Sequence, residues 1–195
     1  GVWLAKLPGS RDGFLHQQNS IRDAIIASIN LNMFTRHADR VRMTAIAQMV
    51  NVLQAMILTD GPRMVLTPTY HLFKMYVPFQ NATRLPIDFD AGTYSFGDVR
   101  VPRIDAIAAR GTDGKLWIAL TNVDPSKPAE IDAQIAGIRV GAASGTVLTA
   151  DRVDAINSFD KPDTVVPRPI SARVNGGRLQ VTLPPKSVTV LSVTP

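Results

Sequence analysis

Gln48 is the residue whose type and position most favour binding of a substrate. It lies near the end of an apolar run at residues 36–51, which begins with alternating charges and has the length of a buried strand in a parallel sheet. Barrel enzymes place substrate contacts at the carboxyl ends of such strands, and an amide can both donate and accept hydrogen bonds. In the alternative interpretation, Gln48 and Asn51 only satisfy neighbouring backbone groups of a core strand.

Acid–base and metal chemistry have few candidate residues. Glu130 is the only glutamate among the 16 acidic residues. His16, His37 and His71 lie far apart in the sequence without ligand-like spacing, and cysteine is absent, so we expect no metal site. We interpret His37 as a buried hydrogen-bonding residue. The glycine patterns of phosphate loops, dinucleotide sites and nucleophile elbows are also absent from the sequence, and we expect no cofactor.

Two helices should position Gln48 from either side in the sequence. Ser20 followed by Asp23 predicts a start that resembles a capping box. Thr67 and Pro68 predict the start of the second helix, because proline at the first helical position loses no hydrogen bond. Residues 52–58 should form a loop or a short helix. One helix, one strand and one helix are less than a closed barrel, since a parallel strand needs neighbours on both sides.

The pattern changes at residue 82. Short alternating runs separated by turn signals are typical of an all-β sandwich. The expected strands are residues 99–109, 115–123, 131–138, 145–150, 172–174, 178–183 and 187–193, with hairpins at 110–114 and 175–177 and a long loop at 152–171. We therefore divide the chain into an α/β part, residues 1–81, and a β-sandwich, residues 82–195.

Composition and charge exclude several classes of protein. With 45% hydrophobic and 19% charged residues, the chain has the balance of an ordinary folded protein, and no apolar run approaches the length of a membrane helix. The net charge of +5 is scattered, without a basic stripe and stacking aromatics, so we expect neither a nucleic-acid nor a membrane partner. The sequence starts at Gly1 without a leader-like segment, as a fragment or a processed chain would. The compartment stays open between cytoplasm and export.

Several motifs resemble the C-terminal part of glycoside hydrolase family 51, the α-L-arabinofuranosidases. They follow one another along most of the chain, so the resemblance is specific, but it covers only the C-terminal part of such an enzyme. The motifs are Asn19-Ser20-Ile21-Arg22-Asp23-Ala24, His37-Ala38-Asp39-Arg40-Val41, Ala47-Gln48-Met49-Val50-Asn51-Val52, Leu66-Thr67-Pro68-Thr69-Tyr70-His71, Asn157-Ser158-Phe159-Asp160 and Val165-Val166-Pro167.

The resemblance implies a fold and an activity. The fold is the last βα portion of a TIM (β/α)8 barrel followed by a C-terminal antiparallel β-sandwich. The activity is that of a retaining α-L-arabinofuranosidase, which hydrolyses terminal arabinofuranosyl residues of arabinan, arabinoxylan and their oligosaccharides. The implied partners are such a saccharide, the missing N-terminal portion of the same enzyme and further copies in a homo-oligomer.

The resemblance also implies roles for single residues. Both catalytic glutamates are expected on the missing N-terminal part, with the nucleophile just upstream of Gly1, and Glu130 matches neither. This chain alone should therefore be inactive and carry no catalytic residue. Gln48 matches a glutamine that hydrogen-bonds the arabinose, and Trp3 matches a tryptophan on the leaving-group side, where an aromatic face can stack on a sugar ring.

Two other interpretations stay open. The chain could be a stand-alone, non-catalytic module, either a carbohydrate-binding sandwich or an interaction domain. The apolar faces of the predicted first helix and strand weigh against this, because nothing in the chain would cover them. The enzyme could also act on another glycoside, since related barrels do and Gln48 alone does not exclude it.

Overall fold

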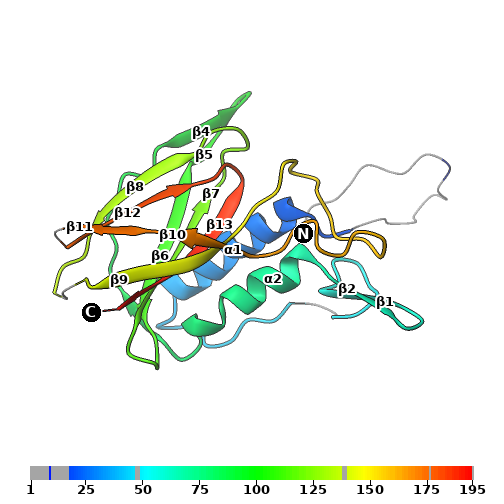
Figure 1. Ribbon diagram of the computed structural model, residues 1–195, viewed down its shortest axis with the longest axis horizontal. Coiled ribbons are helices and arrows are strands. Elements are labelled where there is room, and N and C mark those ends of the chain that lie inside the picture. The colour runs from blue at the N-terminus through cyan, green and yellow to red at the C-terminus, as the bar shows by residue number, and fades with distance from the viewer. Residues whose placement is uncertain (1–8, 10–17, 47–48, 138–139, 176, 195) are drawn as a thin grey trace.

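The computed structural model describes residues 9, 18–46, 49–137, 140–175 and 177–194. Within them, a layer of helices, a six-stranded sheet and a three-stranded sheet lie one upon another (Figure 1). The helix layer contains α1 (Ile21–Arg36), α2 (Pro68–Met75) and the short 3-10 helix η1 (Val77–Phe79). Antiparallel β-sheet therefore dominates the described chain.

The two larger sheets consist of antiparallel strand pairs. In the described residues, the larger sheet has the order β10-β9-β13-β7-β6-β3 and the smaller has the order β11-β12-β8. The strands of the larger sheet are β3 (Thr83–Leu85), β6 (Ile104–Arg110), β7 (Leu116–Asn122), β9 (Ala142–Leu148), β10 (Arg168–Ser171) and β13 (Ser187–Thr194). Those of the smaller sheet are β8 (Ala129–Gln134), β11 (Arg173–Asn175) and β12 (Arg178–Leu183). Two separate hairpins are β1 (Ile57–Asp60) with β2 (Arg63–Leu66), and β4 (Thr93–Phe96) with β5 (Val99–Pro102).

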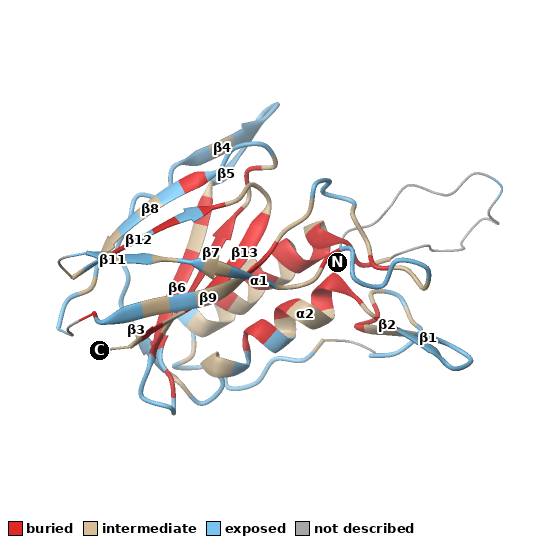
Figure 2. Cartoon of the chain, viewed as in Figure 1, coloured by how far each residue is buried: buried red, intermediate tan, exposed pale blue. Residues whose placement is uncertain are grey.

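The central strands of the six-stranded sheet, β6, β7 and β13, are buried on both faces. Alternate residues of β13 show this best: Val188 and Val190 pack in one cluster with α1 and α2, whereas Leu191 and Val193 pack in another against the three-stranded sheet. Figure 2 shows the buried positions along the helices and the central strands. The strand β13, which lies between β7 and β9, is therefore buried at six of its eight positions, although four of the eight residues are serine or threonine.

Both helix starts are confirmed. The backbone N–H of Ser20 donates to Asp23 Oδ2 at 2.9 Å, which is half of a capping box. Thr67 caps α2 with its side-chain oxygen, and Pro68 is the first residue of that helix. These motifs act within a few residues, and the structure reproduces them where the sequence placed them.

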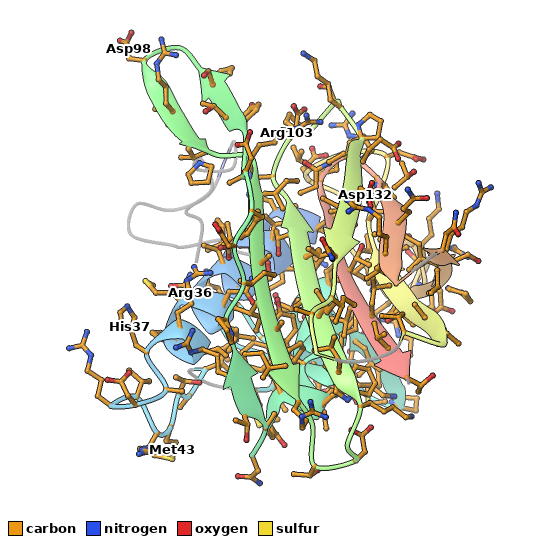
Figure 3. All side chains as sticks on the ribbon, turned by 90° about the vertical axis from the view of Figure 1, so that its left-hand side faces the viewer. Arg36, His37, Met43, Asp98, Arg103 and Asp132 are labelled. Atoms are coloured by element: carbon orange, nitrogen blue, oxygen red, sulfur yellow. The ribbon has the colours of Figure 1, made fainter. Side chains whose placement is uncertain are left out.

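The strand predicted at residues 36–51 is wrong for the described part of that segment. Arg36 still belongs to α1, residues 37–40 form turns, and residues 41–46 have no regular structure, with Met43 86% exposed. Val50 forms only an isolated bridge to Ile57. A parallel strand is stable only between neighbouring strands, and the described residues supply none for this one. His37 is exposed beyond the end of α1 (Figure 3), so its predicted burial is also wrong.

The sandwich strands are confirmed in kind but not in every boundary. The strand predicted at residues 99–109 is two strands: β5 belongs to the separate β4–β5 hairpin, whose tip carries Asp98 (Figure 3), and after Arg103 the chain enters the larger sheet as β6. The β6–β7 and β11–β12 pairs are present. The loop predicted at residues 152–171 ends in β10. No helix in the described ranges is long and apolar enough to cross a membrane.

A polar network fixes the helices to the larger sheet. Arg36 Nη1 donates to Asp105 Oδ1 at 2.7 Å, and Asn32 Nδ2 donates to Asp105 Oδ2 at 2.9 Å. The Tyr76 hydroxyl, buried between the two helices, donates to Asn32 Oδ1 at 2.9 Å. Burial raises the pKa of Tyr76, and the Asp105 carboxylate raises it further, so this hydroxyl stays protonated and acts as a donor. The network makes one packed unit of α1, α2 and β6.

Candidate substrate-binding end

Both longer helices begin at the same end of the molecule, from which the β1–β2 hairpin also projects (Figure 1). The Ala55 carbonyl joins the two starts, because it accepts a hydrogen bond from Asn19 Nδ2 at 3.1 Å and another from Thr67 Oγ1 at 3.1 Å. We call this the helix-start end. In a (β/α)8 barrel, helices begin where the strands end, and that face carries the active site.

Asn157 holds a loop at the helix-start end. Its Nδ2 donates to the Leu66 and Val165 carbonyls at 2.8 and 3.0 Å, and its Oδ1 accepts from the Val165 N–H at 2.7 Å. Gln18 Nε2 donates to the Asn157 carbonyl at 2.9 Å. Asn157 is 1% exposed, and its side-chain amide forms hydrogen bonds to backbone groups. Asn157 is therefore a structural residue that fixes the loop at 149–167 to β2.

Asn51 ties the β1–β2 hairpin to the segment that follows Gln48. Its Nδ2 donates to Thr59 Oγ1 at 2.8 Å, and its Oδ1 accepts from the Thr59 N–H at 2.7 Å. The Ile57 N–H donates to the Met49 carbonyl at 2.9 Å. Asn51 has a positive φ of 54°, a conformation in which asparagine is among the less strained residues. The structure therefore shows Asn51 in a structural role, with its side-chain amide bound to Thr59.

The tip of this hairpin carries charged and aromatic groups. Arg63 forms an ion pair with Asp60, and its guanidinium carbon lies 4.7 Å from the centroid of the Phe159 ring. Arg63 and Asp60 keep 52% and 61% of their side-chain surface exposed. The contact between Arg63 and Phe159 was not predicted from the sequence. Phe159 was part of a family motif without an assigned role, and the two residues are 96 positions apart in the sequence.

His71 lies in the first turn of α2 and is half-buried. Its ring meets the Tyr70 ring edge-on, with 5.7 Å between centroids. Burial lowers the pKa of His71, the Lys74 charge lowers it further, and Asp163 opposes both. The neutral imidazole is thus the form that the fold favours.

Glu130 lies on β8, in the sheet farthest from the helices. The Thr182 hydroxyl lies 2.9 Å from its Oε1 and 2.8 Å from its Oε2 and donates to this carboxylate across the strand pair. This contact is structural and gives Glu130 no place in a catalytic pair. Among the described residues, no group of three or more histidine, aspartate or glutamate side chains could hold a metal ion.

A groove runs between the helices and ends near Asn19. Its lining includes Ile26 and Leu31 of α1, Phe73 of α2 and the exposed segment at 44–46. In the described part of the chain, Asn19 Oδ1 and Thr69 Oγ1 are buried at this groove without a hydrogen-bond partner. Buried polar atoms are rarely left unpaired. The two sequence-predicted site residues, Gln48 and Trp3, lie outside the described residues.

Comparison with known proteins adds the family. A family model described as the α-L-arabinofuranosidase C-terminal domain matches residues 1–187. An intracellular exo-α-L-arabinofuranosidase of Bacteroides ovatus is 44% identical over 195 residues, which are 99% of this chain and 38% of that protein. The chain thus spans about two-fifths of the length of this relative.

Solved structures agree in fold. The GH51 arabinofuranosidase from Xanthomonas axonopodis pv. citri is 48% identical with a TM-score of 0.93, over 98% of this chain and 39% of that one. The α-L-arabinofuranosidase from Thermotoga maritima, solved as an arabinose complex, is 26% identical with a TM-score of 0.81, over 94% of this chain and 40% of that one.

Proposed function

Because this chain belongs to the family of α-L-arabinofuranosidase C-terminal domains, we propose that it completes a retaining enzyme that releases terminal arabinofuranosyl residues from arabinan, arabinoxylan and their oligosaccharides. The observation that carries the proposal is the likeness to a GH51 arabinofuranosidase over 98% of the chain at 48% identity. We call the enzyme that contains this chain the complete enzyme.

In the complete enzyme, residues 1–81 are the last βα portion of the (β/α)8 barrel and residues 82–195 are the sandwich. Three observations support this division of roles. The longer helices begin at one end, as barrel helices do. Residues 42–45 lie exposed, among them Met43 at 86%, where upstream strands would flank them. Asn19 Oδ1 and Thr69 Oγ1 lack the partners that such a neighbour would provide.

The chemistry requires two carboxyl groups about 5–5.5 Å apart, one as nucleophile and one as acid/base. Both are glutamates of the upstream part, since Glu130 is occupied by Thr182 on the far sheet. Gln48 hydrogen-bonds the arabinose in the subsite where cleavage occurs, and Trp3 lines the leaving-group side. The chain alone is inactive because it holds neither carboxylate.

The complete enzyme also assembles as a homo-oligomer. The β4–β5 hairpin supports this, because one of its faces presents Tyr94, Phe96, Val99 and Val101, with Phe96 76% and Val99 61% exposed. Exposed apolar faces of this kind mark interaction sites. Light scattering after size-exclusion chromatography of the complete enzyme measures the number of copies.

Hydrolysis of an aryl α-L-arabinofuranoside tests the proposed function. The complete enzyme should release the aryl group, and the product first formed should retain the anomeric configuration, as proton NMR can record. The 195-residue chain should release none. Absence of hydrolysis by the complete enzyme, or an inverted product, would overturn the proposal. Activity of the isolated chain would overturn the assignment of both glutamates to the upstream part.

A further inference from the structure

The exposed tip of the β1–β2 hairpin joins two distant segments of the chain. Arg63 lies on the hairpin, Phe159 lies on the loop that Asn157 fixes to β2, and Asp60 pairs with Arg63 from the opposite strand. We call Asp60, Arg63 and Phe159 the hairpin platform. A guanidinium that lies over an aromatic ring is restrained by the cation–π contact, and the Arg63 N–H groups that do not bind Asp60 can donate to a ligand.

The hairpin platform is connected to the segment of Gln48 by short contacts. The Met49 carbonyl accepts from the Ile57 N–H at 2.9 Å, and Asn51 binds Thr59 through both side-chain atoms. Thr59 is the neighbour of Asp60. The strand β1, which carries Asp60, is therefore hydrogen-bonded to Met49 and Asn51 at the end of the molecule where both helices begin.

We propose that the hairpin platform binds the arabinose-containing oligo- or polysaccharide chain beyond the sugar that is cleaved. This inference rests on the proposed function and names a second contact region of the same site. The chemistry suits an uncharged polyhydroxylated ligand. Asp60 can accept hydrogen bonds, Arg63 can donate them, and the Phe159 ring offers an apolar surface to sugar C–H groups.

A purely structural role would have a different consequence. If the Arg63–Phe159 stack only held the loop against the hairpin, its loss would affect short and long substrates alike. A contact to the saccharide chain affects only substrates long enough to reach it. The ratio of kcat/KM for a long substrate to kcat/KM for an aryl arabinofuranoside separates the two roles.

The experiment compares variants of the complete enzyme on an aryl arabinofuranoside and on a linear arabino-oligosaccharide. Arg63→Ala should lower kcat/KM for the oligosaccharide on the order of tenfold, mainly through KM, as expected for a lost hydrogen bond to a charged group. Hydrolysis of the aryl substrate should stay at the wild-type rate. Phe159→Leu, which keeps an apolar side chain in the loop, should shift the same ratio in the same direction.

Lys115→Ala is the matched control, because Lys115 lies over the Trp117 ring at 5.9 Å in another cation–π contact, near the β6–β7 turn. Lys115→Ala should leave kcat/KM for both substrates at the wild-type value. Equal losses on both substrates for Arg63→Ala and Phe159→Leu, or no change on either, would overturn the hairpin platform. A wild-type enzyme inactive on both substrates would instead overturn the proposed function itself.

Discussion

At the scale of single residues, an amide that binds a sugar contributes through hydrogen bonds that alanine lacks. Gln48→Ala in the complete enzyme should lower turnover of an aryl arabinofuranoside by about 1–3 kcal/mol, or about five- to 150-fold. Initial rates at saturating substrate measure this. Gln80→Ala, which replaces an exposed glutamine after η1, is the control and should leave the rate unchanged. A wild-type rate for Gln48→Ala would remove Gln48 from the site.

His71 links stability to pH. Its pKa in the folded protein lies below the ordinary 6.5, first through burial and then through Lys74. The unfolded chain therefore binds the proton more readily, and stability that is fully present above pH 6.5 is lost as the pH falls through the folded pKa. Melting temperatures between pH 7.5 and 5 should fall less for His71→Gln than for wild type.

His37→Gln serves as the comparison for this measurement, because it replaces an exposed histidine beyond the end of α1. It should keep the wild-type dependence on pH. A parallel decline in all three proteins would show that His71 does not contribute.

Residue-level predictions from the sequence succeeded where the interaction is local. Ser20 with Asp23, and Thr67 with Pro68, act within one helical turn, so their spacing carries the information. Asn157 was recognised only as part of a motif, because its partner Leu66 is 91 residues away. Arg63 gave no signal for the same reason. Contacts of that range follow from the fold and not from spacing.

At the scale of elements, one hydrogen-bond network joins the helices to β6. Tyr76→Phe keeps the aromatic ring beside Phe79, whose centroid is 5.3 Å away, but leaves the buried Asn32 Oδ1 without its donor. An unpaired buried acceptor costs about 1–3 kcal/mol. The midpoint of urea unfolding of the complete enzyme, followed by tryptophan fluorescence, should fall accordingly. Ser95→Ala, on the other face of the β4–β5 hairpin, should leave the midpoint unchanged, and equal midpoints for both variants would contradict the role of the network.

Strands were predicted correctly where the neighbouring strands that they need lie in the same chain. The antiparallel strands find theirs within residues 82–194, so alternation predicted β7, β8, β12 and β13 near their observed positions. The run at residues 36–51 has strand-like composition, but parallel neighbours are absent from the described chain. Alternation of apolar and polar residues does not give the order of strands in a sheet, so it could not predict that β13 lies between β9 and β7.

At the scale of the molecule, the boundary placed after residue 81 crosses a shared core. Ile21 and Leu72 from the first part lie in one cluster with Ile107 and Val190 from the second, and all four are 3% exposed or less. The helices thus belong by packing to the larger sheet, whatever they contribute to a barrel. Each part alone would expose this cluster, so the two parts should fold and unfold together.

The same reasoning predicts how the isolated 195-residue chain behaves. The helix groove, the segment at 41–46 and the β4–β5 face all present apolar side chains to solvent, and a chain with such faces associates with itself or with a hydrophobic dye. The isolated chain should therefore bind anilinonaphthalene sulfonate and elute as mixed aggregates. Co-expression with the upstream portion should give one dye-free species that hydrolyses the aryl substrate. A stable, dye-free monomer of the isolated chain would instead favour a stand-alone carbohydrate-binding or interaction module, because its apolar faces would then need no upstream cover.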